Sequence, residues 1–343
     1  MLSRVANSLY WMSRYIERAE NIARIVDVNM QLLLDFREAG NGSTDDHWLP
    51  IINATGDDER FFKLYSEING FTVREYLTFQ TKNTNSLISC IGSARENARV
   101  VRDQITLEVW EEINRLYLFL HSRAARELWD SNPSEFYQEI KSSSLHLQGL
   151  TDATIPHTEG WLFMQAAKYL ERADKTSRIL DIRHTSLPQK GVPTQTLDPH
   201  EALEWAAVLR SCSGWDAYRQ IHGADFGPRR IAKFLMLSKD FPRSVAFCIE
   251  ALDSVLRRIS GVQPGRFSNE AEKLSGRLVA EVQFSGIEDV FNYGLHDYID
   301  MLQQRFNQIG AALFAAYIFQ PFNEADELQQ QQEQQQQQHR ISK

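Results

Sequence analysis

A 13-residue motif that returns 154 positions later is the feature that most constrains the fold of this chain. Residues 15–27, YIERAENIARIVD, are matched by residues 169–181, YLERADKTSRILD. The positions that agree in identity or chemistry include Tyr15/Tyr169, Glu17/Glu171, Arg18/Arg172, Ala19/Ala173, Glu20/Asp174, Arg24/Arg178 and Asp27/Asp181. Residues 85–90 resemble 243–248, and Trp48 corresponds to Trp205, at nearly the same offset. Colinear matches of this kind indicate two diverged copies of one module.

The pattern of apolar residues indicates that both modules are helical. From Leu2 to Leu33, apolar or small residues recur at alternating spacings of three and four, as in a long helix packed on other helices. Alternating strand patterns are nearly absent. We therefore expect an all-α helical bundle with tandem, pseudo-symmetric repeats of four or five helices at 1–150 and 151–322, forming one compact domain. Residues 323–343 form a Gln-rich tail, disordered or extending the last helix.

Charge and cysteine usage exclude several classes of function. The formal net charge of −8 argues against nucleic acid or an anionic membrane as partner. No run approaches the ~20 apolar residues of a membrane span, and charges interrupt the N-terminus, so we expect no signal peptide. Three cysteines without a CxxC pair fit a reducing compartment, which predicts a cytoplasmic protein.

A repeated charged stripe is the first candidate site. Glu17, Glu20, Arg24 and Asp27 are spaced three, four and three, so they share one helix face beside the apolar seam. Glu20 and Arg24 form an acid–base pair four residues apart, and Asp174 and Arg178 repeat it. Two interpretations stay open: a salt-bridge ladder at a partly buried interface, or a polar pocket where the two copies converge.

A row of arginines is the second candidate. Arg95, Arg99 and Arg102 follow one line of a helix, with Glu96 able to pair with Arg99. Such guanidinium groups could bind carboxylate or phosphate groups in a bidentate manner, or could form a solvated face with local ion pairs. The second copy keeps only the arginine that corresponds to Arg99, at Arg257. The ten candidate binding residues are Arg14, Glu17, Glu20, Arg24, Arg95, Glu96, Arg99, Arg102, Glu171 and Arg178.

Catalytic and cofactor motifs are missing from the sequence. The nine histidines show no HxxxH, HExxH or ExxH spacing, so we expect no di-metal centre, although a magnesium-type carboxylate site stays open. There is no Gly-x-Ser-x-Gly, no Cys/His motif and no Gly-rich phosphate loop. We therefore expect no bound cofactor and read the cysteines as core residues.

Several segments resemble the bacterial alpha-E family up to about residue 320. They are residues 1–24 (MLSRVANSLYWMSRYIERAENIAR), 85–88 (NSLI), 93–99 (SARENAR), 108–114 (EVWEEIN) and 240–245 (DFPRSV). Asn83 departs from the family pattern, in which a proline is common near this position. The resemblance implies an all-helical domain associated with a circularly permuted ATP-grasp ligase, and with a transglutaminase-like peptidase.

The implied setting is the synthesis of peptide or amide bonds, and three roles stay open within it. The first is a noncatalytic partner or scaffold of the ligase, which helps bind or present a peptide or amino-acid substrate. In that role the arginine row would hold carboxylates, while Glu17 and Glu20 would hold amino groups or cap the arginines. The second is an enzyme of the same pathway with Glu17 or Glu20 as acid or base. The third is a structural module that forms a homo-oligomer.

Overall fold

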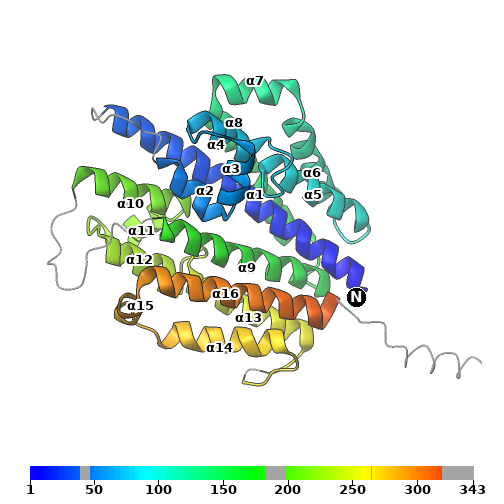
Figure 1. Ribbon diagram of the computed structural model, residues 1–343. Coiled ribbons are helices and arrows are strands. Elements are labelled where there is room, and N and C mark those ends of the chain that lie inside the picture. Colours follow the sequence, from blue (N-terminus) through cyan, green and yellow to red (C-terminus); the bar gives the residue numbers. More distant parts are fainter. Residues whose placement is uncertain (39–46, 183–197, 264, 319–343) are drawn as a thin grey trace, which may run out of the picture.

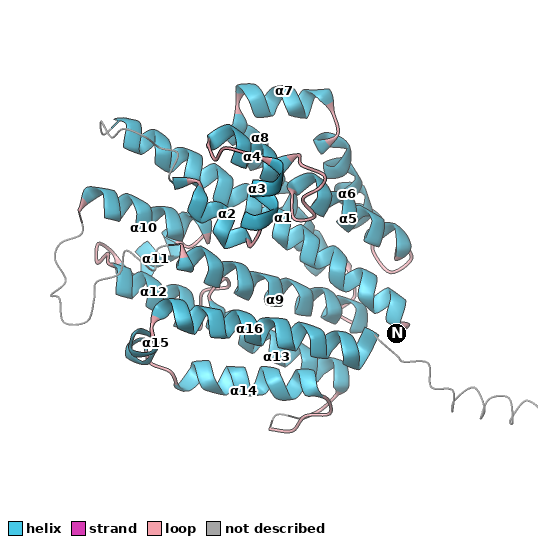
Figure 2. Cartoon of the chain, in the orientation of Figure 1, coloured by secondary structure: helices cyan, strands magenta, loops and turns pink. Residues whose placement is uncertain are grey.

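The computed structural model describes residues 1–38, 47–182, 198–263 and 265–318 (Figure 1). The described residues form helices and no strand, so the predicted all-α class is confirmed (Figure 2). The Gln-rich tail predicted at 323–343 lies outside this part of the chain. Among the described residues, no helix combines the length and apolar character needed to cross a membrane.

Each half of the chain contains four long helices with shorter ones between them. The first half comprises α1 (Ser3–Glu38), α2 (Leu49–Thr55), α3 (Asp58–Leu64), α4 (Gly70–Thr78), α5 (Leu87–Val100), α6 (Leu107–Leu120), α7 (Arg123–Ser131) and α8 (Pro133–Thr154). The second comprises α9 (Glu159–Asp181), α10 (Pro199–Ser211), α11 (Trp215–His222), α12 (Pro228–Leu237), α13 (Val245–Ser260), α14 (Glu270–Phe284), α15 (Ile287–Tyr293) and α16 (Leu295–Leu313), followed by the π-helical turn η3 (Phe314–Ile318).

The long helices contact one another in the same order in both halves. In the first half α1 packs on α5, α5 on α6, α6 on α8, and α8 on α1. In the second half α9 packs on α13, α13 on α14, α14 on α16, and α16 on α9. This matched order supports a pseudo-symmetric repeat, which stays a prediction. The short helices between the long ones were not expected from the sequence, and α8 runs across the expected boundary at residue 150 to Thr154.

The two helices that carry the repeated motif form the centre of the molecule. In Figure 1, α9 lies between α1 and α16, and α1 also packs on α5, α8 and α10. The buried apolar side chains of both halves belong to one continuous cluster. The middle of α1 is buried on several sides because other helices surround it. Side chains of its charged stripe are therefore also removed from water, with Glu17 1% and Glu20 0% exposed.

Two equivalent serines begin the helices that pack on this central pair. Ser86 precedes α5 and its side chain accepts a hydrogen bond from the backbone N–H of Ser89. Ser244 precedes α13 and accepts in the same way from Phe247. Each hydroxyl pairs a backbone donor of the first turn that would otherwise have no partner. Both residues are fully buried, so water cannot replace the lost bond.

We expect Ser86→Ala and Ser244→Ala each to lower the free energy of unfolding by about 1 kcal/mol, because each leaves a backbone amide of the first helical turn unpaired. Urea unfolding followed by circular dichroism measures the change. Ser131→Ala, at an exposed helix end, is the control and should change stability by less than about 0.5 kcal/mol. Equal stability of all three variants would contradict the role of these serines.

Candidate functional site

Two crossed glutamate–arginine pairs join α1 to α9. Glu17 of α1 accepts hydrogen bonds from Arg172 of α9, with distances of 2.8 Å from Nε to Oε1 and 2.9 Å from Nη2 to Oε2. In the reverse direction, Glu171 of α9 accepts from Arg18 of α1, with distances of 2.7 Å from Nε and 3.0 Å from Nη2. The glutamate of each motif thus binds the arginine of the other motif, and both glutamate–arginine contacts are bidentate.

Additional donors complete the surroundings of Glu17. Arg243, two residues before α13, donates from Nη1 to Oε1 at 3.0 Å. Gln148 of α8 donates to Oε2 at 3.0 Å, while its own carbonyl oxygen accepts from Arg172 at 2.9 Å. The carboxylate of Glu17 is therefore held by three side chains from three different segments. This satisfies a charge that would otherwise be costly to bury.

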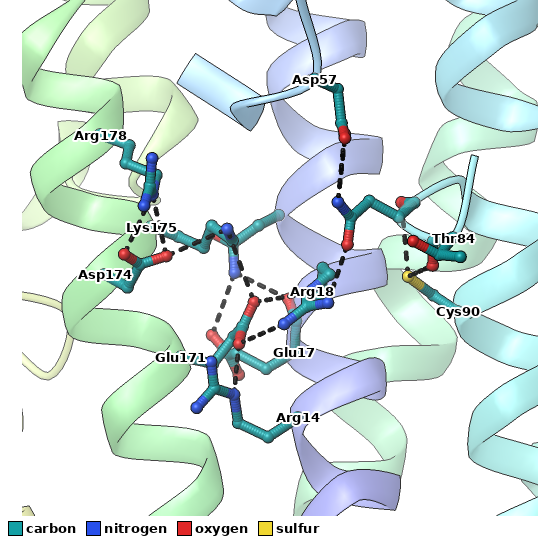
Figure 3. Close-up of polar contacts among 12 residues, drawn as sticks. Arg14, Glu17, Arg18, Asp57, Thr84, Cys90, Glu171, Asp174, Lys175 and Arg178 are labelled. Carbon is teal, nitrogen blue, oxygen red and sulfur yellow. Dashed lines mark hydrogen bonds and ion pairs between the residues drawn. The ribbon is translucent and has the colours of Figure 1, made fainter. Parts of the chain in front are cut away.

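Glu171 has a comparable set of partners on the opposite side (Figure 3). Arg14 of α1 donates to its Oε2, and Lys175 Nζ lies 3.7 Å from its Oε1. Arg18 also donates from Nη1 to the side chain of Asn85 at 2.8 Å, and Asn85 in turn donates to Asp57 at 3.1 Å. Figure 3 shows Arg14 and Arg18 pointing from α1 towards Glu171 on α9. The network thus extends from the central helices to the loop before α5.

These contacts determine the protonation states of both glutamates. Burial alone would raise the pKa of Glu17, but Arg172 and Arg243 outweigh it and lower the pKa to about 2. Burial opposes ionisation of Glu171 in the same way, and Arg14 and Arg18 hold its pKa well below its usual range. Both side chains are therefore carboxylates at neutral pH. Neither is suited to accept a proton in a reaction, because a general base works best with a pKa near the operating pH.

The repeated pair four residues apart also forms in both copies. Arg24 donates to Glu20 from Nε at 2.8 Å, and Arg178 donates to Asp174 from Nε at 3.0 Å. Arg243 Nη2 lies 3.1 Å from Glu20 Oε2, so this arginine joins Glu20 to the cluster around Glu17. The stripe is thus an interhelical network of ion pairs, as in the ladder interpretation of the sequence.

The last member of the stripe, Asp27, has partners on α8. It binds Lys141 Nζ at 2.6 Å and the Ser134 hydroxyl at 2.8 Å. Both contacts tie the second half of α1 to the last long helix of the first repeat. The four residues of the stripe therefore hold α1 against α8, α9 and the segment before α13.

The arginine row lies elsewhere, on the outer side of α5. The opposite side of α5 packs on α1 through Leu87, Cys90, Ile91, Ala94 and Ala98. Arg95 donates to Asn114 at 2.8 Å, and Glu96 pairs with Arg99 at 2.7 Å. Arg102 is not on the helix as expected, because α5 ends at Val100 and residues 101–104 form a turn. The expectation that Glu17 or Glu20 cap these arginines is wrong, since both glutamates are occupied by Arg172, Arg243 and Arg24.

Sequence reasoning missed several members of the central cluster. Arg18 and Arg172 directly follow Glu17 and Glu171 in the sequence and were not included in the charged stripe. Gln148 and Arg243 come from distant segments of the chain. The repeat itself contained a signal for the first two, because both copies keep an arginine directly after the glutamate. Arg243 lies in segments that the repeat and the family resemblance singled out, but nothing in the sequence indicated that it or Gln148 would contact Glu17.

The three cysteines are buried and free, as expected of core residues. Burial raises the pKa of each of Cys90, Cys212 and Cys248 to about 12. A thiol with so high a pKa is almost entirely protonated at neutral pH, and the thiolate is the nucleophilic form. These groups are therefore poorly suited to nucleophilic chemistry.

Fold and site together define an all-helical protein in which two Glu-Arg dipeptides bind each other across the central helix pair. The chain belongs to the Alpha-E family, described as a predicted alpha-helical domain with a conserved ER motif, whose model matches residues 1–318. Glu-Arg dipeptides occur in this chain at 17–18, 59–60 and 171–172, and the first and the third form the contact between α1 and α9.

Curated relatives carry no assigned activity. The chain is 24% identical over 276 residues to uncharacterised proteins of Mycobacterium bovis and Mycobacterium tuberculosis. The match covers 75% of this chain and 30% of each relative, so the chain spans less than a third of their length. No solved structure matches this chain.

We expect Glu17→Gln to lower the free energy of unfolding by about 3–5 kcal/mol, because Arg172 and Arg243 would stay buried without a compensating charge. Glu171→Gln, which removes the negative charge that Arg14 and Arg18 bind, should lower the free energy of unfolding by a similar amount. Urea unfolding measures both changes. Glu127→Gln, which breaks an exposed pair with Arg123, is the control and should cost less than about 1 kcal/mol. If Glu17→Gln and Glu171→Gln lowered the free energy of unfolding no more than the control does, the crossed pairs would not be what holds α1 and α9 together.

The lowered pKa of Glu17 also predicts how stability depends on pH. A carboxylate whose pKa is lower in the folded than in the unfolded chain stabilises the fold above the unfolded pKa, and this contribution is lost as pH falls towards the folded pKa. Stability should therefore decline between about pH 5 and about pH 2. Glu17→Gln removes one such group, so its stability should decline less steeply than that of the wild type. Melting temperatures across this range test the difference, and parallel curves would contradict it.

Proposed function

We propose that this chain is a noncatalytic helical scaffold for a ligase of the ATP-grasp type that forms peptide or amide bonds. In this role it helps bind or present a peptide or amino-acid substrate. The ligase, and a transglutaminase-like peptidase as a second partner, come from the family resemblance. A cytoplasmic location belongs to the same proposal, because such a ligase consumes ATP and because the described cysteines are free thiols.

The surface formed by α5 and α6 carries the proposal. We call it the α5–α6 face and define it by Arg95, Arg99, Arg102, Trp110 and Tyr117. The Arg95 guanidinium lies 4.5 Å from the centre of the Tyr117 ring, and that of Arg102 lies 5.0 Å from the centre of the Trp110 ring. Arginine and aromatic residues are enriched at the centres of protein interfaces, where they contribute much of the binding energy.

Charge and exposure indicate what this face would bind. The side chain of Arg99 is 64% exposed, and the apolar Val100 and Leu107 beside the turn after α5 are 49% and 57% exposed. Glu96 is the acidic residue that pairs with this row, contacting both Arg95 and Arg99. An acidic surface of the ligase, with apolar side chains at its centre, complements such a face.

The central cluster favours a scaffold over the enzyme alternative. Glu17 is a fully paired carboxylate with a pKa of about 2, and it accepts hydrogen bonds from Arg172, Arg243 and Gln148. A proton acceptor must be free to approach its substrate and must have a pKa near the working pH. Glu20 is fully buried and is held by Arg24. Both glutamates hold helices together, which is what a rigid scaffold requires.

The test is association of the full chain with a tagged copy of the ATP-grasp ligase encoded beside it. We expect co-purification, and we expect Arg99→Glu combined with Arg102→Glu to weaken the association at least tenfold, because both charges on the face are reversed. Arg123→Glu is the control, since Arg123 is 92% exposed on α7 and pairs with Glu127 outside the face. Surface plasmon resonance measures the three affinities.

Ligase turnover then separates docking from substrate presentation. Presentation predicts that the chain lowers the KM of the ligase for its peptide or amino-acid substrate. A stable homo-oligomer of this chain that ignores the ligase would overturn the proposal in favour of an oligomerisation module. Turnover by the chain alone, lost in Glu17→Gln while folding is retained, would overturn it in favour of an enzyme.

A further inference from the structure

A histidine and two aspartates meet where the end of α9 faces the start of α16. Asp181 is the last residue of α9, and His296 and Asp300 lie one turn apart on α16. His296 Nδ1 is 2.9 and 3.0 Å from the two carboxylate oxygens of Asp181, and His296 Nε2 is 3.7 Å from Asp300 Oδ2. One possible ligand atom from each residue lies within 4.8 Å of those of the other two.

We propose that Asp181, His296 and Asp300 form a binding site for a divalent transition-metal ion of the Zn²⁺ type. Ligand atoms about 2.1 Å from such an ion are roughly 3–3.5 Å from one another. The Nδ1 atom of His296 lies at about this distance from the carboxylate of Asp181. Asp300 approaches the other ring nitrogen, Nε2, which cannot bind the same ion, so its side chain, which is 53% exposed, has to rotate towards Nδ1 to become the third ligand.

The surroundings supply space and further oxygen donors. The three residues line a cavity of about 480 Å³, whose walls also include Asn53, Gln303 and Arg178. The amide oxygens of Asn53 and Gln303 are suitable additional ligands, and the volume leaves room for water or an exogenous anion on the ion. Catalytic zinc sites likewise combine three protein ligands with an open position.

The donor atoms at this place suit a cation. Asp181 and Asp300 contribute two carboxylates beside the imidazole of His296. The nearby positive charge of Arg178 is already bound by Asp174, with Nε 3.0 and 3.1 Å from the two carboxylate oxygens. Zn²⁺ and its neighbours in the periodic table bind imidazole nitrogen well. Mg²⁺ instead prefers oxygen ligands and retains its waters. The ligand set therefore selects a transition metal.

The position in the fold also distinguishes this site from the crossed pairs. It joins the end of α9, one central helix, to α16, so an ion there would fix the angle between these two helices. It does not share a residue with the α5–α6 face, and it does not depend on the proposed ligase partnership. The sequence offered no hint of it, because Asp181 and His296 are 115 positions apart.

The test uses the untagged full chain, stripped with a chelator and titrated with ZnCl₂, MnCl₂ and MgCl₂ in an isothermal calorimeter. We expect one equivalent of Zn²⁺ to bind, more tightly than Mg²⁺. His296→Gln and Asp300→Asn should each weaken Zn²⁺ binding at least about tenfold, since even the loss of an outer-shell partner has an effect of about 10–100-fold. Co²⁺ as a probe should give visible absorption bands in the wild type and lose them in both variants.

His157→Gln is the matched control. His157 is a surface imidazole whose Nε2 lies 3.6 Å from a carboxylate oxygen of Asp152. Its variant should bind Zn²⁺ as the wild type does. The proposal is overturned if the wild type binds no stoichiometric Zn²⁺, if Asp300→Asn binds it unchanged, or if His157→Gln weakens binding as much as His296→Gln. Melting curves of all variants without metal show that each is folded.

Discussion

The structure depends on the burial of two carboxylates that can be ionised only because the other half of the chain supplies their cations. Glu17 and Glu171 lie in the middle of the molecule, and each binds the arginine that follows its counterpart. Isolated charges cannot be buried at acceptable cost, so neither central helix is stable alone in this position. The reciprocal bonds also fix the register of α1 against α9, because a shift by one residue would break both bidentate pairs at once.

In this arrangement the charged groups of the motif are buried and paired, so other molecules can bind only at the outer surfaces. The charged groups of the motif are held by internal ion pairs and hydrogen bonds, and the three thiols are buried beside charged residues of this network. The two features to which we assign binding roles lie on the outside: the α5–α6 face, and the cavity between the end of α9 and the start of α16. A rigid ionic centre with chemically distinct outer sites suits a protein that positions other molecules.

The two occurrences of the motif differ in the side chains around them. Arg243 donates a hydrogen bond directly to Glu17. Its counterpart Asn85 instead accepts a hydrogen bond from Arg18 and donates one to Asp57. Lys175 supports Glu171, whereas its counterpart Asn21 donates to the backbone of Glu17. The Glu-Arg dipeptide itself is unchanged in both copies. The two motifs therefore share the contact between the halves and differ in their surroundings, and α13 has no arginine at the positions that correspond to Arg95 and Arg102.

The sequence by itself determined the all-helical class and the i,i+4 pairs Glu20–Arg24 and Asp174–Arg178, because these depend on short-range periodicity, and the repeated motif predicted two related halves. It also indicated that the charged stripe lies near the core. Only the tertiary structure decided which charges meet: that Arg172 binds Glu17, that Arg243 and Gln148 join them, that the arginine row stays apart, and that His296 lies beside Asp181. Those partners are separated by up to 226 positions, and no local pattern encodes which side chains of distant helices come within hydrogen-bond reach.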